Sequence, residues 1–488
     1  MTLLAASTVP VSWSAIAPEI VLLSCACVLL TSAIFLPARI AHAVSAVVAV
    51  GGFAGAMVAP IAEWHDAGRY AFDHTLHIDA FGNGSRLLIF GAGILAVVLA
   101  WGMPRVSERA IEYHALLLSA AAGMSLLSVA NSLMILFVAL ELFSIALYVL
   151  VAIDADELPG LEGGLKYLVI GSVGAAFLLY GSALVYGATG ELEFDRIATG
   201  IADAHSGVLL LGIALIVVGL GFKANSAPFH MWTPDAYEGA PTPVTAFMSA
   251  ATKTVALVVT LRVLVVAFGE ESAIWETAIG ALAIASFVVG NLAALRQTNV
   301  KRMLAYSTVG HTGFLFTAVA AHSQLGTRAL LYYLTIYSLM NIGAFALVAI
   351  RERELGRPVV IDDFRGYGYR RPLLAIAMVV FMLSLAGLPP AGGFIGKLSI
   401  WSAAVEAGQT YLAVAGVAAT VVALGYYLKI PFALFDRDVT VPDAPSRPAL
   451  AATSATVLAT GIAVLVLGIV PGPLFDLAQT ASRSLIGG

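Results

Sequence analysis

The sequence predicts an all-α polytopic membrane protein, and three observations support this fold class. The chain of 488 residues is 60% hydrophobic and only 11% charged, and its mean hydropathy is +0.93. So few charged residues cannot solvate a globular surface of this size. The apolar residues also come in runs of about 20, the length at which an α-helix crosses a bilayer. These features exclude most soluble enzymes, and the net charge of −5 is spread over loops, which excludes a basic surface for nucleic acid.

Dividing the apolar runs at Pro, Gly and charge clusters predicts about 14 transmembrane helices. The first seven are expected near residues 15–36, 40–60, 80–101, 112–129, 132–153, 164–187 and 206–224. The second seven are expected near residues 242–267, 273–295, 303–320, 328–350, 373–405, 411–435 and 449–470. No basic segment precedes the first run, which favours an ordinary spanning helix there over a cleaved signal peptide.

Two of the predicted spans are broken helices. Lys223 lies in the glycine- and proline-containing segment 219–230, and Lys397 follows a similar segment at 385–396. Proline removes a backbone donor and clashes with the preceding turn, so the break frees carbonyl groups that water or side chains must satisfy. Spans four to eight and nine to thirteen form two groups of five, with the broken span fourth in each. Because five is odd, the second group is inverted, as in many transporters; the alternative is two ordinary proline kinks.

We therefore expect a single integral membrane domain over residues 1–488. Its parts are an N-terminal three-helix segment at 1–111, a first five-helix repeat at 112–267, an inverted second repeat at 273–435 and a C-terminal helix at 449–488.

The distribution of Lys and Arg between spans predicts that both termini lie on the outer side, because cytoplasmic loops retain basic residues. With this orientation the inner loops hold Arg39, Arg105, Arg109, Arg296, Lys301, Arg302, Arg351, Arg353, Arg357, Arg365, Arg370, Arg371, Arg437 and Arg447. The outer loops and the C-terminus hold only Arg69, Arg196, Arg328 and Arg483.

The cysteine content argues against a redox centre in this chain. Cys25 and Cys27 are the only cysteines, and both lie inside the first apolar run. An iron–sulfur cluster or a disulfide framework cannot be built from them alone. We predict no cofactor or metal site here, so any redox chemistry must occur outside this chain.

Lysine is placed inside the predicted spans, whereas arginine dominates the loops. All lysines except Lys301 fall within spans, and these are Lys166, Lys223, Lys253, Lys397 and Lys429. A desolvated ammonium can lose its proton, while a guanidinium effectively cannot, so buried lysines suit groups that must titrate. Lys253, in the middle of its span, is the strongest candidate.

Glu141 also lies in the middle of a span, where a carboxylate costs at least roughly 2.5 kcal/mol. Such residues usually face a bundle interior or a water cavity and mark ion paths or proton relays. The alternative is a structural ion pair that fixes helix packing. Lys166 begins its span after an acidic loop, so it either neutralises that loop or partners Glu141. Glu19, near the outer end of the first span, is expected at the membrane interface.

Three further polar residues have less specific surroundings. His311 lies within a span, where a neutral imidazole can relay a proton through its two nitrogens; hydrogen-bonded packing is an equal alternative. Arg262, near the outer end of its span, is expected to be a snorkelling or salt-bridged anchor, and Arg86 to snorkel from a span end.

Several motifs resemble one known family. They are GFK at 221–223, PFHMWTPDAYEGAPTPVTAF at 228–247, QTNVKRMLAYS at 297–307, YSLMNIGAF at 337–345 and GLPP at 387–390. Together they resemble the antiporter-like membrane subunits of respiratory complex I, from Glu141 to beyond Lys397. The WTPD form at 232–235 and the Thr-Lys pair at 252–253 resemble the subunit N branch of that family.

The resemblance implies a role for each candidate residue. Glu141 and Lys166 would form the charge pair, and Lys253 would be the central proton carrier. Lys223 would link them, Lys397 would lie on the exit side, and His311 falls where the family has a polar connector. We expect protons to enter from the cytoplasm, pass along water between Lys223 and Lys253, and leave by Lys397.

The resemblance also implies a setting for the chain. It would be a subunit of the proton-translocating enzyme NADH:quinone oxidoreductase in the bacterial cytoplasmic (inner) membrane. Its partners would be the adjacent antiporter-like subunit and the small membrane subunits, and flavin, iron–sulfur clusters and quinone would belong to partner subunits. Two alternatives are a subunit of a multisubunit sodium/proton antiporter or membrane-bound hydrogenase, and a structural subunit that does not pump.

Overall fold

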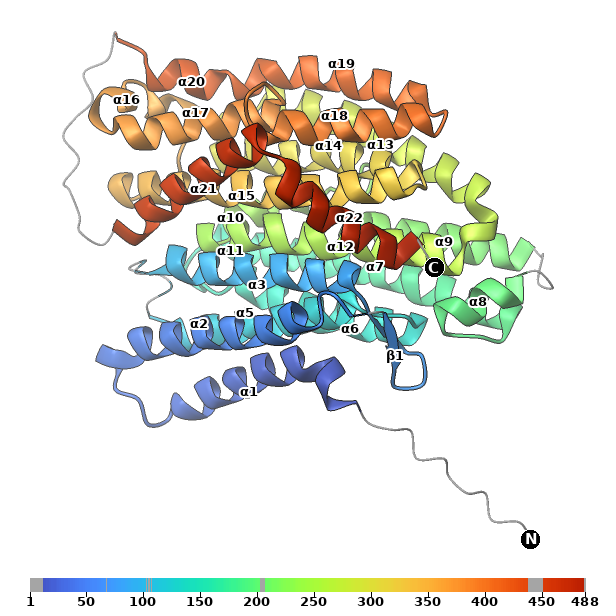
Figure 1. The fold of residues 1–488 in the computed structure, drawn as a ribbon. Coiled ribbons are helices and arrows are strands. Elements are labelled where there is room, and N and C mark those ends of the chain that lie inside the picture. Colours follow the sequence, from blue (N-terminus) through green and yellow to red (C-terminus); the bar gives the residue numbers. More distant parts are fainter. Residues whose placement is uncertain are drawn as a thin grey trace.

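A computed structural model describes residues 12–66, 68–101, 103, 106, 108–201, 207–437 and 451–486. The helices lie side by side in one bundle, and they follow each other across it roughly in chain order, from α1 at one edge to α19 at the other (Figure 1). This arrangement confirms the predicted all-α membrane fold.

Each of the predicted spans coincides with a helix or a pair of helices. In the first half these are α1 (Ala17–Ser32), α2 (Ala38–Ala62), α3 (Ala80–Ala100), α5 (Ala110–Ser128), α6 (Leu133–Val151), α7 (Leu158–Thr189) and α9 (Gly207–Lys223). In the second half they are α11 (Thr242–Phe247) with α12 (Lys253–Arg262), α13 (Ser272–Leu295), α14 (Val300–Ala320), α15 (Gln324–Leu355), α17 (Pro372–Ala386) with α18 (Gly392–Glu406), α19 (Thr410–Tyr427) with α20 (Lys429–Leu434), and α21 (Ala451–Ile469).

Within the described residues, 11 helical segments are long and apolar enough to cross a membrane, and two shorter apolar helices are α9 and α17. The shorter two belong to the broken spans. α14 is outside this set because it is polar, and it can be polar because nearly all of its residues are buried among other helices. The exact number of spans, the inverted relation of the two repeats and the side on which the termini lie remain predictions. Arg105 and Arg447, which entered the orientation argument, lie outside the described residues.

Both predicted breaks are present. The first helix of the first broken span, α9, ends at Lys223, and the chain continues without regular helix to α10 (Thr233–Gly239). The second break separates α17 from α18, and Gly387 ends α17 with a φ of +82°. A Cβ atom at Gly387 would lie 2.7 Å from Cδ of Lys397, so this position requires glycine for its backbone and for its space.

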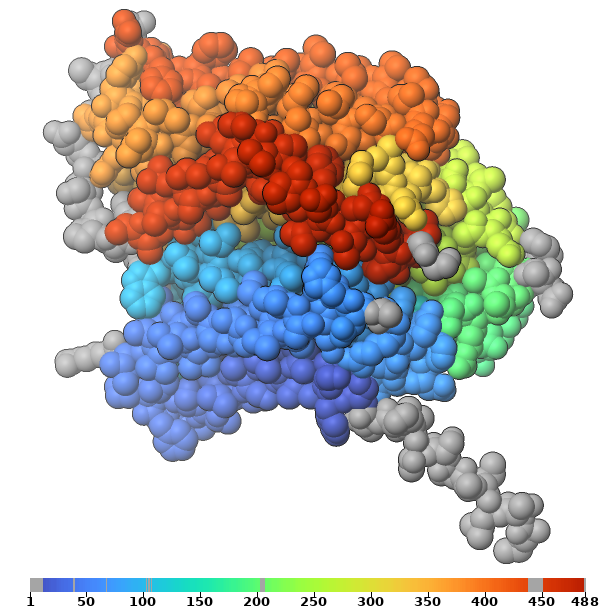
Figure 2. All heavy atoms as spheres, viewed as in Figure 1, coloured from blue at the N-terminus to red at the C-terminus, as the bar shows by residue number. Residues whose placement is uncertain are grey.

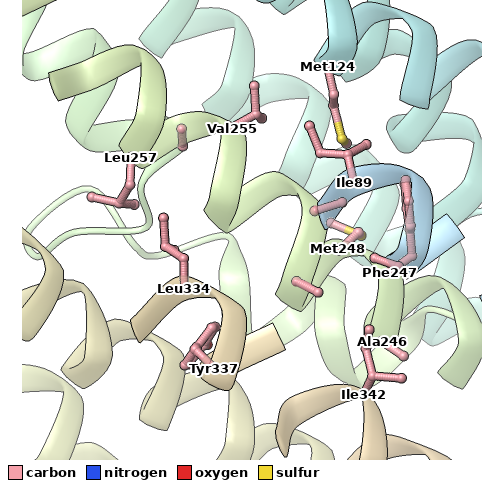
Figure 3. Close-up of a cluster of buried hydrophobic side chains, with 14 of the residues drawn as sticks. Ile89, Met124, Ala246, Phe247, Met248, Val255, Leu257, Leu334, Tyr337 and Ile342 are labelled. Carbon is pink, nitrogen blue, oxygen red and sulfur yellow. The ribbon is translucent and has the colours of Figure 1, made fainter. Parts of the chain in front are cut away.

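The span at residues 242–267 contains a feature that the sequence did not suggest. Two π-helical turns, η2 (Met248–Thr252) and η3 (Val263–Ala267), bracket the ten-residue helix α12. This span lies in the core of the bundle. Figure 3 shows part of that core, where Phe247 and Met248 lie beside Ile89 and Met124. π-helical turns occur frequently at functional sites.

Three short elements lie at the end of the bundle that carries the N-terminus of α1. An antiparallel hairpin joins β1 (Arg69–Ala71) to β2 (Leu76–Ile78), and α8 (Phe194–Ile201) lies next to it. The 3-10 turns η1 (Trp13–Ile16) and η4 (Gly269–Glu271) belong to this end as well, and η5 (Ile361–Phe364) and α16 (Tyr367–Arg370) lie at the opposite end. The hairpin was not predicted because its strands are only three residues long.

The C-terminal segment contains two helices instead of the one predicted. After α21, the helix α22 (Gly472–Ile486) runs obliquely across the bundle (Figure 1). Both α21 and α22 lie on the face of the molecule that Figure 2 shows. Arg328 of α15 donates a hydrogen bond to Gln479 at 3.1 Å, and Tyr332 stacks on Phe475 with ring centroids 4.2 Å apart. α22 was missed because its polar residues interrupt the apolar run, although they pair with the helices beneath.

Two interface predictions were wrong. Glu19 and Arg86 do not reach an interface but form a buried ion pair at 2.8 Å, with side chains 8% and 1% exposed. Ser125 donates a second hydrogen bond to Glu19 at 2.6 Å. Each charged side chain is the partner of the other, so neither has to extend toward water.

Candidate functional site

Lys253 is fully enclosed near the middle of the bundle. Its Nζ donates hydrogen bonds to the carbonyl oxygens of Ala224 at 2.7 Å and Thr308 at 3.3 Å, and to the hydroxyl of Thr312. The ammonium group has three N–H donors, so these three acceptors satisfy its charged form completely. The Ala224 carbonyl is available because α9 ends one residue earlier. The first break therefore supplies a ligand to the lysine of a neighbouring span.

Lys223 is also buried, and it points to the opposite side of the break from Lys253. Its Nζ donates to Ser144 Oγ of α6 at 2.7 Å and lies over the rings of Phe143, Tyr148 and Tyr167 at 5.4 to 5.8 Å. Aromatic faces attract a cation electrostatically. This aromatic surrounding holds the Lys223 ammonium in a site where, among the described residues, a hydroxyl group and no carbonyl oxygen accepts its hydrogen bond.

Glu141 lies one helical turn before Ser144 on α6 and is within electrostatic range of Lys223. It is partly exposed on the side of the bundle, and its Oε1 atom, which is buried, has no hydrogen-bond partner among the described residues. An unpaired carboxylate oxygen in a membrane protein requires water, a proton or a neighbouring subunit as a partner.

The predicted pair of Glu141 with Lys166 is not formed. Lys166 is 41% exposed, and its Nζ contacts Glu162 of its own helix and Asp235 of α10, both at 2.6 Å. Of the two possibilities that the sequence left open, neutralisation of acidic residues near the start of the helix is the one observed. The reason is geometric, because Lys166 lies in the third turn of α7, near the N-terminal end of that helix, and extends toward α10.

Asp235 and its neighbours form a cluster that sequence reasoning did not single out. Arg302 Nη1 contacts Asp235 at 2.6 Å and Glu238 at 2.8 Å, and Asn299 donates to Glu238 at 3.1 Å. Lys166 joins the cluster through Asp235. Asp235 and Glu238 fall within the quoted motif at 228–247, and Asn299 and Arg302 fall within the motif at 297–307. These two motifs were the signal in the sequence that could have pointed to the cluster.

His311 lies on α14, the same helix as Thr308 and Thr312, and it is buried. Its Nδ1 is 2.7 Å from the hydroxyl of Tyr333 and its Nε2 is 2.8 Å from the hydroxyl of Tyr427. The Tyr427 hydroxyl also bonds to Ser307. Hydroxyl groups both donate and accept, so a neutral imidazole with two such partners can take a proton at one nitrogen and release it at the other.

Lys397 belongs to the second break. Its Nζ donates to the carbonyl oxygens of Leu385 at 3.0 Å and Ala386 at 3.2 Å, which are the last residues of α17. It lies 4.4 Å from the centroid of Phe314, whose ring is also next to His311. The carbonyls freed by a broken helix thus accept hydrogen bonds from lysine at both breaks, as the sequence predicted, although Lys253 and not Lys223 does so at the first.

The structure therefore brings Lys223, Lys253, His311 and Lys397 into one polar series in the bundle interior, with Glu141 at its side, and leaves Lys166 in a separate cluster. Hydroxyl groups contact Lys223, Lys253 and His311, and the chemistry they allow is transfer of protons. Among the described residues, no group of His, Cys, Asp and Glu is arranged to hold a metal ion.

Residues 130–423 match the protein family described as NADH:quinone oxidoreductase/Mrp antiporter, transmembrane. A protein named NADH-quinone oxidoreductase subunit N from Trichlorobacter lovleyi is 38% identical over an alignment of 486 residues, which covers 97% of this chain and 97% of its own. The chain belongs to the NADH-quinone oxidoreductase subunit N family. A subunit N from Parvibaculum lavamentivorans is 41% identical over 84% of this chain and 85% of its own.

Solved structures agree with this membership. A chain of respiratory complex I from Thermus thermophilus has a TM-score of 0.80 and 35% identity, covering 95% of this chain and 99% of its own. A chain of the Mrp complex from Dietzia sp. has a TM-score of 0.83 and 21% identity, covering 96% and 98%. The second likeness concerns the fold alone. Fold therefore does not separate the candidate families, whereas sequence identity places the chain with subunit N.

Proposed function

We propose that this member of the subunit N family moves protons across the membrane, and that Lys253 is the central proton carrier. The observation that carries the proposal is the coordination of Lys253 by Ala224, Thr308 and Thr312 in the interior of the bundle. A buried lysine with no carboxylate partner among the described residues cannot be explained as a static ion pair within them, because its charge would be uncompensated.

The ligands of Lys253 suit both protonation states. The ammonium form uses all three acceptors, and the neutral amine needs a donor for its lone pair. The Thr312 hydroxyl can supply that donor by rotating, and its oxygen also lies 2.8 Å from the Ala224 carbonyl and 3.2 Å from that of Thr308. A proton can therefore arrive and leave with little movement of the surrounding backbone.

The proposed route follows the polar series. Protons reach Lys223, pass to Lys253, continue through His311 with its tyrosine partners, and leave by Lys397. The Phe314 ring lies next to both His311 and Lys397, and an aromatic ring cannot relay a proton, so transfer there would need water or rotation of a side chain. The breaks at α9 and α17 serve the route because their freed carbonyls hold the lysines that take up the proton.

The driving force in this proposal is electrostatic. Moving a proton against 100 mV requires about 2.3 kcal/mol. A change in the charge near Lys223 would alter its proton affinity, and Glu141 is the acidic residue within range. Lys166 would act through Asp235 and α10 instead of pairing with Glu141. The coupling of Glu141 to Lys223 thus replaces the pair that the family resemblance implied.

The enzymatic reaction belongs to the whole assembly. We propose that electron transfer from NADH to quinone takes place in partner subunits that hold flavin, iron–sulfur clusters and quinone. This chain would contribute the membrane part, beside another antiporter-like subunit and the small membrane subunits in the bacterial inner membrane. The partly exposed side of α6 that includes Glu141 faces away from the bundle and is available to such a neighbour.

The test is Lys253→Met in the assembled complex, with proton uptake by inverted membrane vesicles measured alongside electron flux from NADH to quinone. Loss of both in a complex that assembles normally is the expected result. Lys429→Met is the matched control, because Lys429 is a span lysine that, in the part of the chain the structure describes, donates to the Leu295 carbonyl alone, and pumping should remain. Normal pumping by Lys253→Met would favour a structural, non-pumping subunit.

A further inference from the structure

The hairpin β1–β2 contacts the same span that carries Lys253, at the span's other end. Asp79 follows β2 and caps α3, where its Oδ1 accepts from the Gly82 amide at 2.8 Å. The same oxygen accepts from Nη2 of Arg262 at 2.6 Å, and both side chains are 0% exposed. Arg262 is the last residue of α12. The ion pair therefore ties the end of α12 to the start of α3.

The buried pair is incompletely hydrogen-bonded. Asp79 Oδ2 and Arg262 Nε are both buried and have no hydrogen-bond partner among the described residues. A buried carboxylate oxygen without a partner costs free energy and leaves an acceptor ready for a new donor. A histidine lies close to this oxygen: Nδ1 of His77 is 3.5 Å from Asp79 Oδ2.

His77 contacts both members of the pair. Its Nδ1 is 3.3 Å from Nη1 of Arg262, and a guanidinium can only donate. Neutral His77 must therefore accept from Arg262 through Nδ1, which assigns its proton to Nε2. Protonation at Nδ1 ends that hydrogen bond, brings a second positive charge against Arg262, and provides a donor for the unpaired oxygen of Asp79.

A stack of aromatic rings connects His77 to the surface. Tyr70 lies between His77 and His74, with ring centroids 4.5 Å and 4.3 Å away. His74 is 42% exposed and contacts Asp195 of α8 at 2.9 Å. The titratable and charged groups that face His77 are thus Tyr70 and His74 on the hairpin, Asp79 after it, Asp195 on α8 and Arg262 on α12.

The contact of Arg262 with Asp79 and His77 can affect the position of Lys253, because Arg262 and Lys253 lie at the two ends of the same helix. α12 begins at Lys253 and ends at Arg262, and a π-helical turn lies directly before and after it. A π-helical turn carries an extra residue, so converting it to α-helix rotates the segment beyond it. The short α12 can therefore rotate between its two flanking π-helical turns unless another contact holds it. The ion pair of Arg262 with Asp79 is such a contact, at the C-terminal end of α12.

We propose that Asp79, His77 and Arg262 form an acid-sensitive clamp that positions α12, and with it Lys253, and that protonation of His77 from the hairpin side loosens it. The three residues are positioning residues because none of them carries the transported proton. The effect on transport rests on the proposed function, whereas the clamp itself does not. A pump with this device slows when protons accumulate on the hairpin side.

The electrostatic surroundings set the pH range. Burial lowers the pKa of His77 from its ordinary value of 6.5, Asp79 raises it and Arg262 lowers it, with a net decrease. The clamp is therefore closed at neutral pH. Because the folded-state pKa is below the unfolded value, the stability from neutral His77 is complete above about pH 6.5 and decreases as the pH falls toward the folded-state pKa.

Hydrogen–deuterium exchange of the assembled complex tests the clamp without using transport. Exchange in the peptides covering residues 69–79 and 258–267, corrected for the intrinsic effect of pH, should become about tenfold faster between about pH 7.5 and about pH 5, as expected for loss of a hydrogen bond to a charged group. In His77→Gln, which cannot take up a proton, the corrected rates should not change with pH.

His322→Gln is the matched control, because His322 pairs with Glu276 at 3.0 Å and does not contact α12; this variant should retain the wild-type acid response. His74→Gln should also retain it if His77 is the responsive group. An acid response that persists in His77→Gln, or no response in the wild type, would overturn the clamp.

Transport gives a separate readout. In vesicles acidified on one side at a time, acid on the hairpin side should lower the initial pumping rate of the wild type more than that of His77→Gln, while uncoupled electron flux stays equal. Equal inhibition of both would refute the regulatory effect. If Lys253→Met pumps normally but the exchange results hold, the clamp stands and the proposed function fails.

Discussion

The Nζ atom of Lys253 donates a hydrogen bond to the carbonyl oxygen of Ala224 at 2.7 Å. Ala224 follows Lys223 in the chain, so a single residue, Ala224, connects the two lysines that we propose as successive proton carriers. The contact exists because α9 stops at Lys223 and leaves the next carbonyl without a helical donor. The break therefore interrupts the span and also supplies a carbonyl oxygen that accepts a hydrogen bond from Lys253.

The ligand set of Lys253 predicts an effect of Thr312→Val. This change removes the hydroxyl but keeps the shape of the side chain. A hydrogen bond to a charged group is worth about 1.5–3 kcal/mol, so the proton affinity of Lys253 and the pumping rate should change by about tenfold or more, with normal assembly. Proton uptake by inverted vesicles measures this.

Two variants make the Thr312 experiment specific. Thr312→Ser keeps the hydroxyl and should pump at close to the wild-type rate. Thr254→Val removes a buried hydroxyl whose one hydrogen bond within the described residues is to the Ala250 carbonyl of the same span, and it should leave pumping unchanged. If Thr312→Val pumped normally, the hydroxyl would have no part in proton transfer.

Glu141 should be coupled to Lys223 and not to Lys166. We expect the effects of Glu141→Gln and Lys223→Met on the pumping rate to be non-additive, because the two groups interact electrostatically. The effects of Glu141→Gln and Lys166→Met should be additive, since Lys166 contacts Glu162 and Asp235. Double-mutant cycles on the assembled complex compare the two pairs, and strong coupling of Glu141 to Lys166 would restore the charge pair implied by the family.

Gly387→Ala should impair both stability and pumping. A left-handed backbone with a Cβ atom costs about 1–2 kcal/mol, and this Cβ would also press on Lys397 at 2.7 Å from its Cδ. Gly190 has a similar φ of +76° at the end of α7, with nothing within 4 Å of an added Cβ. Gly190→Ala therefore has the backbone cost alone, and it should pump normally once assembled.

The comparison of these two glycine variants separates the effect of backbone strain from the effect of displacing Lys397. The amount of assembled complex reports the backbone effect, and the pumping rate per assembled complex reports the effect on Lys397. Equal pumping by both variants would mean that the position of Lys397 is not critical.

The buried pair of Glu19 and Arg86 should be important for stability. Arg86→Met leaves the Glu19 carboxylate buried with Ser125 as its remaining side-chain partner, and breaking a buried pair typically costs about 3–5 kcal/mol. Arg196→Met breaks an exposed contact with Asp73 and should change stability by less than about 1 kcal/mol. The denaturant midpoint of the assembled complex measures both.

A double variant, Glu19→Met with Arg86→Met, should recover much of the stability lost in the single variant, because no uncompensated charge remains. If Arg86→Met alone were neutral, the pair would have no structural role, and the residues would be open to another interpretation.

The features that could be predicted from the sequence are those with local causes. The breaks at Lys223 and Lys397 follow from proline and glycine beside them, and the helical spans follow from apolar length. The importance of Lys253 follows from a charge in the middle of an apolar run. Those inferences needed no knowledge of which helices are neighbours. α22 was missed because its polar residues satisfy partners on α15 and α3 that lie far away in the sequence.

The sequence by itself determined the membrane fold, the two breaks and the buried lysines, because hydrophobic length and backbone chemistry act within about 20 residues. Only the tertiary structure decided which groups those lysines and the other charged side chains contact. Lys253 and Thr312 are 59 positions apart, Lys166 and Asp235 are 69, and Arg262 and Asp79 are 183. Such partners are selected by the packing of whole helices, since a buried charge takes whichever donor or acceptor the assembled bundle brings within reach.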